Sequence, residues 1–228
     1  MQITQRFFVL VGIGVIAGGF GFRDACFGAD SSVLFDGKDT SALRAYKQQG
    51  FPTNGWKIEN GALRTVAGQG DDLITRASYK DYDLSFQWKV APGANSGVIY
   101  NVDESGRAPW HSGPEYQVLD DAKHPDGKNP KTTAAALYGI LAPNSSKALK
   151  PVGEWNQARI VNKGGHVEHW LNGAKVLEYD WTDPKIREAV KSTKFTEFST
   201  FMAKPEGHIV FQHHGDDVWF RNIRIKRL

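Results

Sequence analysis

The strongest constraint on the fold is the strict alternation of apolar and polar residues from Tyr82 to Val90, YDLSFQWKV. Successive side chains of a β-strand point to opposite faces, so this pattern predicts a strand that is buried on one side only. Similar short runs, separated by Gly, Pro, Asn or Asp, continue to the end of the chain. They are SGVIYNV, EYQVLD, ALYGIL, QARIVN, HVEHWL, KVLEYD, HIVFQH and VWFRNIRI.

Turn and helix signals complete the prediction of the fold. An Asn-Gly pair in LNGAK and another in IENGAL each predict a tight hairpin, because both residues tolerate positive φ. The single helix candidate is DPKIREAVKS, in which Asp183 would cap the amino end and Pro184 would begin the first turn. Many evenly spaced strands and one short helix predict an all-β, two-sheet antiparallel sandwich of jelly-roll type, formed as one domain by residues 30–228.

Residues 1–29 have the pattern of a secretory signal peptide. Arg6 precedes an apolar run, and small residues follow it in CFGAD. An uncleaved membrane anchor is the alternative, but the run is shorter than the roughly 20 apolar residues that a spanning helix needs. We expect cleavage near Ala29 and a periplasmic or secreted protein, which meets a membrane only if the segment stays uncleaved. Cys26, the only cysteine, would leave with this segment, and the mature chain could then form no disulfide of its own.

Charge argues against one class of partner. The 228 residues carry a formal net charge of +3 and contain no basic run, which disfavours nucleic-acid binding. We also expect no nucleotide cofactor.

Strand parity places polar side chains where a site could form. In EYQVLD, Glu115 and Gln117 share one face, and Tyr116 and Val118 share the other. Glu115 and Gln117 could simply face solvent on an outer sheet surface, since antiparallel sheets often leave one face wet.

The stretch HIVFQHHGDDVWFRNIRI poses the same question near the end of the chain. By parity, Gln212 and His214 share a face, and Arg221 shares one with the apolar residues Trp219 and Ile223. Arg221 could instead be a snorkelling side chain at the rim, and either histidine alone would be an ordinary turn residue.

Histidines recur between these two regions. In HVEH, His166 and His169 fall on opposite faces of a regular strand, so they cannot both hold one ion, and His169 could be a hydrogen-bonded core residue. All seven histidines lie between His111 and His214, together with several tryptophans. Histidines, carboxylates and flat aromatic surfaces are what a sugar site that handles protons would use, although most tryptophans of a sandwich belong to its core.

Several long motifs resemble one known family. They are GPEYQVLDDAKHPD, ALYGILAP, KPVGEWNQARIVNKGGHVEHWLNGAKVLEYD and QHHGDDVWFRNIRI, with the opening LFDGKDTSALRAY and the central NSGVIYNV. In this order, and over nearly the whole chain from Val33 to Arg227, they resemble the bacterial 3-keto-disaccharide hydrolase family, formerly a domain of unknown function. The resemblance implies a concanavalin A-like jelly roll and cleavage, by hydrolysis or by elimination and hydration, of glycosides already oxidised to a ketone at C3.

The resemblance also implies the site residues. One departure from the family is visible, because members commonly read QDHGD where this chain reads QHHGD, which puts His213 in place of an aspartate. The implied catalytic residues are Glu115, His169, His214 and Arg221, and the implied substrate contacts are Gln117, Trp110, His111, Asp120, Tyr138 and Gln212.

The chemistry of a 3-keto sugar suits this residue set. Retaining glycosidases use two carboxylates roughly 5 Å apart, whereas the face of Glu115 and Gln117 continues with Leu119. A C3 ketone acidifies the C2 hydrogen, so one base, one acid and a positive group at the enolate oxygen suffice. We expect Glu115 or a histidine to be the base, with Arg221 or a divalent cation at the enolate oxygen. The QHHGDD turn would form one wall of the site, and the turn would bring Arg221 close to His214.

Two other classes stay open. The same fold makes non-catalytic carbohydrate-binding modules and lectins, which rely on aromatic platforms and hydroxyl contacts. An ordinary endoglucanase is disfavoured, because the carboxylate pair is missing.

Overall fold

The computed structural model describes residues 31–228. The expected signal peptide and Cys26 lie outside these residues, and no helix within them is long and apolar enough to cross a membrane.

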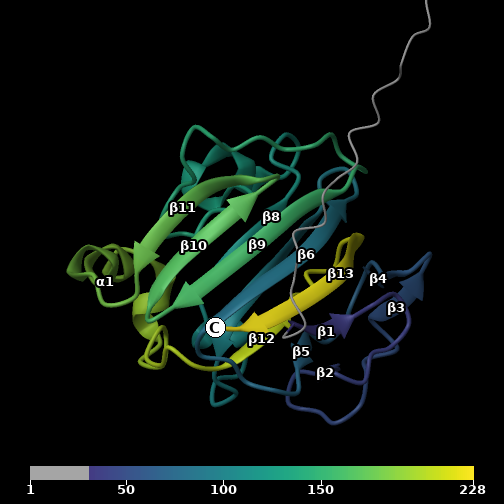
Figure 1. The fold of residues 1–228 in the computed structure, drawn as a ribbon. Helices are drawn as coiled ribbons and strands as arrows, with labels where there is room; N and C mark the ends of the chain where they lie inside the picture. The colour runs from purple at the N-terminus through teal and green to yellow at the C-terminus, as the bar shows by residue number, and fades with distance from the viewer. Residues whose placement is uncertain (1–30) are drawn as a thin grey trace, which may run out of the picture.

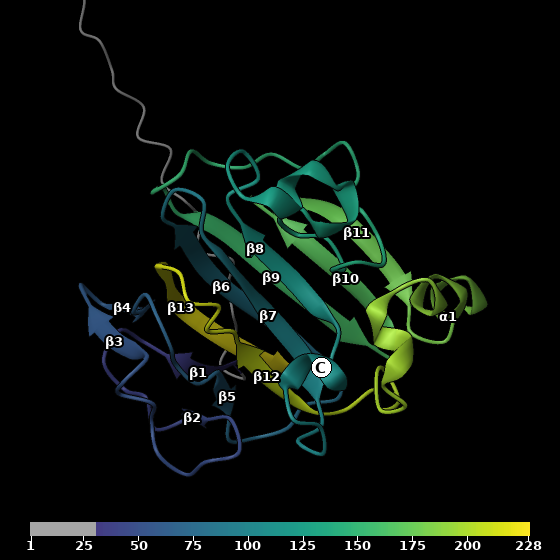
Figure 2. The same cartoon turned by 180° about the vertical axis from the view of Figure 1, so that it is seen from behind.

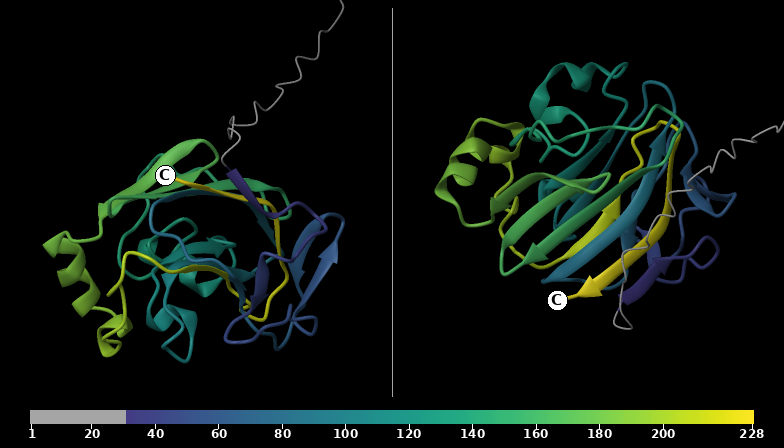
Figure 3. Two further views of the ribbon diagram at one scale, coloured as in Figure 1. Left: turned by 60° about the horizontal axis from the view of Figure 1, so that its bottom comes forward. Right: turned by 45° about the horizontal axis from the view of Figure 1, so that its top comes forward.

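Two antiparallel sheets pack face to face, as the two layers in Figure 3 show. The larger sheet has the order β11-β10-β9-β6-β13-β4-β3, and β1 pairs with β13 (Figure 1). Its strands are β1 (Ser31–Phe35), β3 (Trp56–Glu59), β4 (Ala62–Thr65), β6 (Tyr82–Val90), β9 (Asn156–Lys163), β10 (His166–Leu171), β11 (Ala174–Asp180) and β13 (Val218–Arg227).

The smaller sheet has the order β2-β5-β12-β7-β8. Its strands are β2 (Leu43–Ala45), β5 (Leu73–Thr75), β7 (Asn95–Val102), β8 (Glu115–Leu119) and β12 (His208–Phe211). Together the sheets confirm the predicted all-β antiparallel sandwich.

The core lies between the sheets and is rich in aromatic rings. The burial of β6 alternates along its whole length, as the sequence pattern predicts. From it, Phe86 meets Tyr116 and Phe211 of the smaller sheet edge to face, at ring distances of 5.7 and 6.0 Å. Burying each such ring stabilises the fold by roughly 1.5–3 kcal/mol.

The turn and helix predictions are confirmed. Asn172 and Gly173 have φ of 49° and 87° between β10 and β11, and the Asn-Gly pair of IENGAL joins β3 to β4 in the same way. Helix α1 spans Pro184–Lys191, and Asp183 accepts a hydrogen bond from the Lys185 amide as its cap.

Strand β13 departs from the predicted parity. Asn222 has a positive φ of 52°, and the pairing with β6 shifts between Arg221 and Arg224, so the strand contains a bulge. Ile223 points into the core, whereas Trp219 and Arg221 point to the outer surface of the larger sheet. The prediction that Arg221 shares a face with Ile223 is wrong, because a bulge exchanges the two faces of a strand.

Irregular segments surround the outer face of the smaller sheet, on the side that Figure 2 presents. Four short 3₁₀ turns lie in them, η1 (Pro109–His111), η2 (Pro125–Lys128), η3 (Pro130–Thr132) and η4 (Lys194–Glu197). Residues 135–138 run along the free edge of β8, where the Ala135 amide donates to the Gln117 carbonyl (2.8 Å) and the Tyr138 amide to the Glu115 carbonyl (3.0 Å). Loops therefore cover part of the outer face of the smaller sheet, which strand parity alone would leave open to water.

Candidate active site

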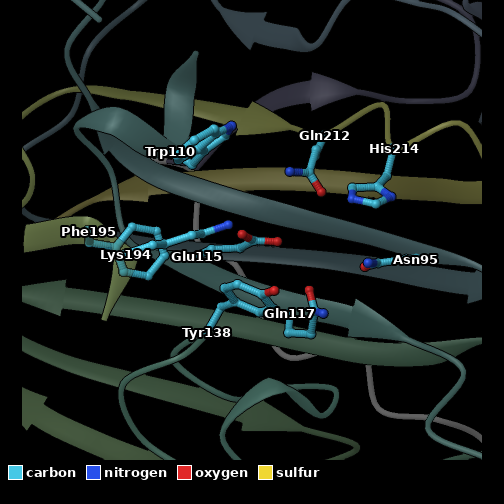
Figure 4. Close-up of a pocket in the computed structure, with 9 residues that line it drawn as sticks. All are labelled: Asn95, Trp110, Glu115, Gln117, Tyr138, Lys194, Phe195, Gln212 and His214. Carbon is cyan, nitrogen blue, oxygen red and sulfur yellow. The ribbon is translucent and has the colours of Figure 1, made fainter. Parts of the chain in front are cut away.

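The outer face of the smaller sheet gathers polar side chains from three neighbouring strands. Gln117 of β8 lies opposite Gly97 of β7. Gln212, which follows β12, donates its amide hydrogen to the Gly97 carbonyl at 2.9 Å. Gln117, Gly97 and Gln212 therefore form one row across the sheet, with Glu115 on one side of it and His214 on the other (Figure 4).

These side chains line a pocket of about 220 Å³. It receives Trp110 from η1, Tyr138 from the segment beside β8, and two residues of η4. The lining residues are Asn95, Trp110, Glu115, Gln117, Tyr138, Lys194, Phe195, Gln212 and His214.

The hollow above the sheet depends on Gly97. A Cβ atom on this residue would lie 1.9 Å from Oε1 of Glu115 and 2.6 Å from its Cδ. The absence of a side chain at Gly97 lets the Glu115 carboxyl lie across β7 and face the pocket, which is the close approach that a glycine within a strand often marks.

Glu115 has the properties of a proton-transfer group. Its carboxyl is buried, and no side-chain hydrogen bond to it occurs within residues 31–228. Burial raises the pKa of Glu115 to about 8, Asp72 and Asp126 raise it further, and the positive charge of Lys194 opposes them. A carboxyl that titrates this close to neutral pH can accept a proton as a strong base and release it again.

Asp72 is a half-buried carboxyl whose charge acts on Glu115. It precedes β5 and accepts a hydrogen bond from the His213 amide at 2.8 Å. Burial raises the pKa of Asp72 to about 6. Sequence parity did not mark this residue, because β5 is only three residues long.

Lys194 is the cationic side chain of the pocket that sequence reasoning missed. Its Nζ lies over three aromatic rings, at 4.7 Å from the centre of Trp110, 5.4 Å from Tyr138 and 5.5 Å from Phe195. Neither strand periodicity nor a motif marks Lys194, because it belongs to a short 3₁₀ turn outside the sheets.

Two buried amide oxygens of the pocket have no hydrogen-bond partner among residues 31–228. Gln117 donates through Nε2 to the Thr132 carbonyl at 3.2 Å, which fixes the orientation of its amide and leaves Oε1 unpaired. Oδ1 of Asn95 is unpaired as well. An unpaired buried acceptor costs roughly 1–3 kcal/mol, so both oxygens favour a ligand that brings hydroxyl donors. Asn95 was also missed, although it begins the central motif NSGVIYNV.

The two adjacent histidines have different surroundings. His214 is exposed and lines the pocket. The ring of His213 points the other way, where its Nε2 lies 3.0 Å from the Val66 carbonyl and the ring packs against Gly70 and the edge of Trp56. The departure from the family motif at His213 thus falls outside the pocket.

Arg221 does not lie near the pocket. Strands β12 and β13 belong to different sheets, so the turn between them leads away from the site. On the outer surface of the larger sheet, Arg221 donates through Nε to Oε1 of Gln87 at 2.7 Å and covers the ring of Trp155 at 3.9 Å. The expectation that the turn brings Arg221 close to His214 is therefore wrong.

His169 is a core residue. It is fully buried between the sheets, its Nδ1 donates to the Ala135 carbonyl at 3.0 Å, and its Nε2 accepts from the Tyr100 hydroxyl at 2.9 Å. Burial lowers the pKa of His169 to about 4, which keeps the ring neutral. His169 is the hydrogen-bonded core residue of the alternative interpretation, and the expectation that it is a catalytic residue of the site is wrong.

Two expected substrate contacts also lie outside the pocket. Asp120 accepts from the Gly93 amide through Oδ2 (2.7 Å) and from the Ala122 amide through Oδ1 (3.0 Å), so it fixes the turn after β8. The His111 ring stacks on Phe198 at 4.0 Å and meets the Trp110 ring edge to face at 4.4 Å, and it does not line the pocket.

A cluster of metal-ligand type occurs elsewhere. His166, Glu168 and Glu178 are the one group of three His, Cys, Asp or Glu side chains in the described part of the chain that could reach a common ion. They lie on the outer surface of the larger sheet, where Lys175 already contacts Glu168 at 3.1 Å and Glu178 at 2.5 Å.

Comparison with known proteins adds a family to this geometry. Residues 30–226 match the family model described as the 3-keto-alpha-glucoside-1,2-lyase-like domain. The chain belongs to this family. A 3-keto-disaccharide hydrolase of Bacteroides thetaiotaomicron is 36% identical over an alignment of 226 residues. The match covers 86% of this chain and 77% of that protein.

Solved structures agree with the assignment to the 3-keto-alpha-glucoside-1,2-lyase-like family. A candidate glycosyl hydrolase of Parabacteroides distasonis superposes with a TM-score of 0.80 at 30% identity, over 87% of this chain and 94% of that one. A non-specific endo-beta-1,3(4)-glucanase of family GH16 superposes with a TM-score of 0.52 at 12% identity, over 88% of this chain and 96% of that one. The second likeness concerns the fold alone and supports the jelly-roll architecture.

Proposed function

We propose that this protein cleaves 3-keto-glycosides in the pocket on the smaller sheet and that Glu115 is its base. The observation that carries the proposal is the buried carboxyl of Glu115, which lies over Gly97 without a hydrogen-bond partner in the described part of the chain and has a pKa of about 8. Membership of the family and the 36% identity to a 3-keto-disaccharide hydrolase support the substrate class.

The proposed reaction is a β-elimination. The Glu115 carboxylate takes the proton from C2, which the neighbouring C3 ketone acidifies, and the C–H electron pair forms an enolate. The enolate electrons then form the C1–C2 double bond while the C1–O bond breaks, and the departing oxygen receives a proton. Addition of water across the double bond completes a net hydrolysis.

His214 is the proposed acid for the departing oxygen. In Figure 4 it lies across the pocket from Glu115, on the side away from Lys194. An acid on one side of the base and a cation on the other matches the order C1, C2 and C3 along a sugar ring. The unpaired oxygens of Asn95 and Gln117 would accept hydrogen bonds from the sugar hydroxyls.

A divalent cation is a further part of the proposal. The amide oxygens of Asn95 and Gln117 could hold a hard cation in place of sugar hydroxyls, and such an ion would polarise the ketone. Removal of metal with EDTA and restoration with Mg²⁺, Mn²⁺ or Ca²⁺ tests this part, because loss and recovery of turnover are both required.

A non-catalytic carbohydrate-binding module is the second candidate. Three aromatic rings at the pocket, those of Trp110, Tyr138 and Phe195, favour it, since flat rings bind sugars. A binding module has no use for a buried carboxyl with a raised pKa, and this difference separates the two functions.

Release of the aglycone decides between them. Purified protein is incubated with a 3-keto aryl glucoside and, in parallel, with the unoxidised glucoside. We expect release from the ketone alone and a loss of roughly 10²-fold or more in Glu115→Gln. Glu168→Gln, on the opposite side of the molecule, is the matched control. Saturable binding without release in the wild type would favour the binding module.

We also propose that the protein is exported and that residues 1–29 are removed. Amino-terminal sequencing of periplasmic material should begin near Ala29 or Asp30. An intact Met1 in the membrane fraction would contradict export with cleavage.

A further inference from the structure

Lys194 is exposed, and its ammonium group has an environment unlike those of the half-buried Lys147 and Lys175. Lys147 pairs with Asp121 at 2.5 Å, and Lys175 pairs with Glu168 at 3.1 Å. Within residues 31–228, Lys194 forms no such ion pair, and its Nζ is held by the faces of Trp110, Tyr138 and Phe195. The ring faces attract the cation but accept none of its hydrogen bonds in the ordinary way, so its N–H donors are available to a ligand.

The turn that carries Lys194 is held by a capping hydrogen bond and by an aromatic stack. Thr193 caps η4 by accepting a hydrogen bond from the Phe195 amide, and the Phe195 ring stacks on Phe201 at 4.3 Å. These contacts fix the backbone at Lys194, and the three ring faces hold its Nζ beside the pocket before a substrate arrives, which favours electrostatic stabilisation.

We propose that Lys194 binds the C3 oxygen of the substrate and stabilises the negative charge that develops there in the enolate. This inference rests on the proposed function. It gives to a residue of η4 the role that the sequence suggested for Arg221, which lies on the outer surface of the larger sheet.

The movement of charge explains why this position is useful. In the resting site, Lys194 faces the Glu115 carboxylate, whose pKa it lowers. When Glu115 takes the C2 proton, it becomes neutral, and the negative charge passes to the C3 oxygen. Lys194 keeps its proton throughout and changes its anionic neighbour from the carboxylate to the enolate, so its attraction helps the transition state.

A lysine beside a ketone could also form an imine. That step needs a neutral amine, adds it to C3 and expels the ketone oxygen as water. The ring faces of Trp110, Tyr138 and Phe195 attract a positive charge, so the structure favours the electrostatic role. Borohydride distinguishes the two roles, because it reduces an imine to a stable adduct.

The variants Lys194→Met and Lys194→Arg test the proposal in the full chain. Lys89→Met is the matched control, since the Lys89 ammonium also lies over two rings, Trp155 at 5.1 Å and Trp219 at 4.8 Å, on the opposite surface. We expect kcat/KM on a 3-keto aryl glucoside to fall roughly 10²-fold or more in Lys194→Met, to recover in part in Lys194→Arg, and to stay at the wild-type level in Lys89→Met.

The pH profile supplies a readout that a purely structural role would not change. Loss of the Lys194 charge should move the alkaline rise of kcat/KM to higher pH, because that charge lowers the pKa of Glu115. Wild-type kcat/KM in Lys194→Met, or a borohydride adduct on Lys194, would overturn the role while leaving the proposed function intact. A wild-type protein that cleaves no 3-keto-glycoside would overturn both.

Discussion

Glu115 and Gly97 are neighbours across β8 and β7, and the carboxyl of the first occupies space that any side chain on the second would need. The pair forms the floor of the pocket. We expect both the activity of the protein and its pH dependence to depend on this contact.

Gly97→Ala should displace Glu115 and reduce activity at least roughly 10-fold, because the new methyl group would meet the carboxyl at 1.9 Å. Overpacking of this kind also costs about 1–3 kcal/mol of stability. Turnover and thermal melting of Gly97→Ala should be compared with Gly50→Ala, whose added Cβ would meet nothing within 4 Å. Equal activity in the two variants would mean that the position of Glu115 is unimportant.

The rate should rise with pH up to about 8, because the base must lose its proton and the pKa of Glu115 is about 8. Asp72→Asn should shift this rise to lower pH, since the charge of Asp72 raises the pKa of Glu115. Profiles of kcat/KM between pH 5 and 10 check both expectations. A profile that is flat from pH 6 to 9 would contradict the assignment of Glu115 as the base.

The raised pKa of Glu115 also predicts how stability changes with pH. Between the ordinary value of 4.5 and the folded value of about 8, the folded state binds more protons than the unfolded state. Unfolding free energy should therefore fall as pH rises through this window. Urea unfolding at pH 5 and pH 8 should show a fall larger in wild type than in Glu115→Gln by at least about 1 kcal/mol. The same pH dependence in both proteins would refute the raised pKa.

His214→Ala and Arg221→Ala should show which of the two sheets carries the active site. His214→Ala should lower kcat roughly 10²-fold with little change in melting temperature, because the exposed ring faces the pocket. Arg221→Ala should keep wild-type turnover, since its guanidinium contacts Gln87 and Trp155 on the other surface. The opposite result, activity lost only in Arg221→Ala, would move the site to the larger sheet.

His169→Ala should act on stability. The change leaves a cavity between the sheets and an unpaired Ala135 carbonyl, and we expect Tm to fall by about 5 to 15 °C. The folded fraction should keep its specific activity at low temperature. A selective loss of turnover at an unchanged Tm would restore His169 to the reaction.

The sequence by itself determined most of the elements and their faces, although ALYGIL, expected as a strand, forms turns with isolated bridges at Leu137 and Leu141. Side chains alternate along a strand with a period of two, so the pattern of Tyr82 to Val90 and the shared face of Glu115 and Gln117 follow from local geometry. The Asn-Gly turns and the Asp183 cap are equally local, because their backbone conformations depend on a few consecutive residues.

Only the tertiary structure decided which faces meet. β12 and β13 are joined by a short turn yet belong to opposite sheets, and the bulge at Asn222 reverses the faces of β13, so Arg221 lies far from His214. Lys194 enters the site from a 3₁₀ turn, and Asp72 acts on Glu115 from the start of a short strand, and neither segment has a periodic signal. Strand parity specifies two faces for each strand, but the pairing of strands distant in sequence determines which face becomes the floor of a pocket.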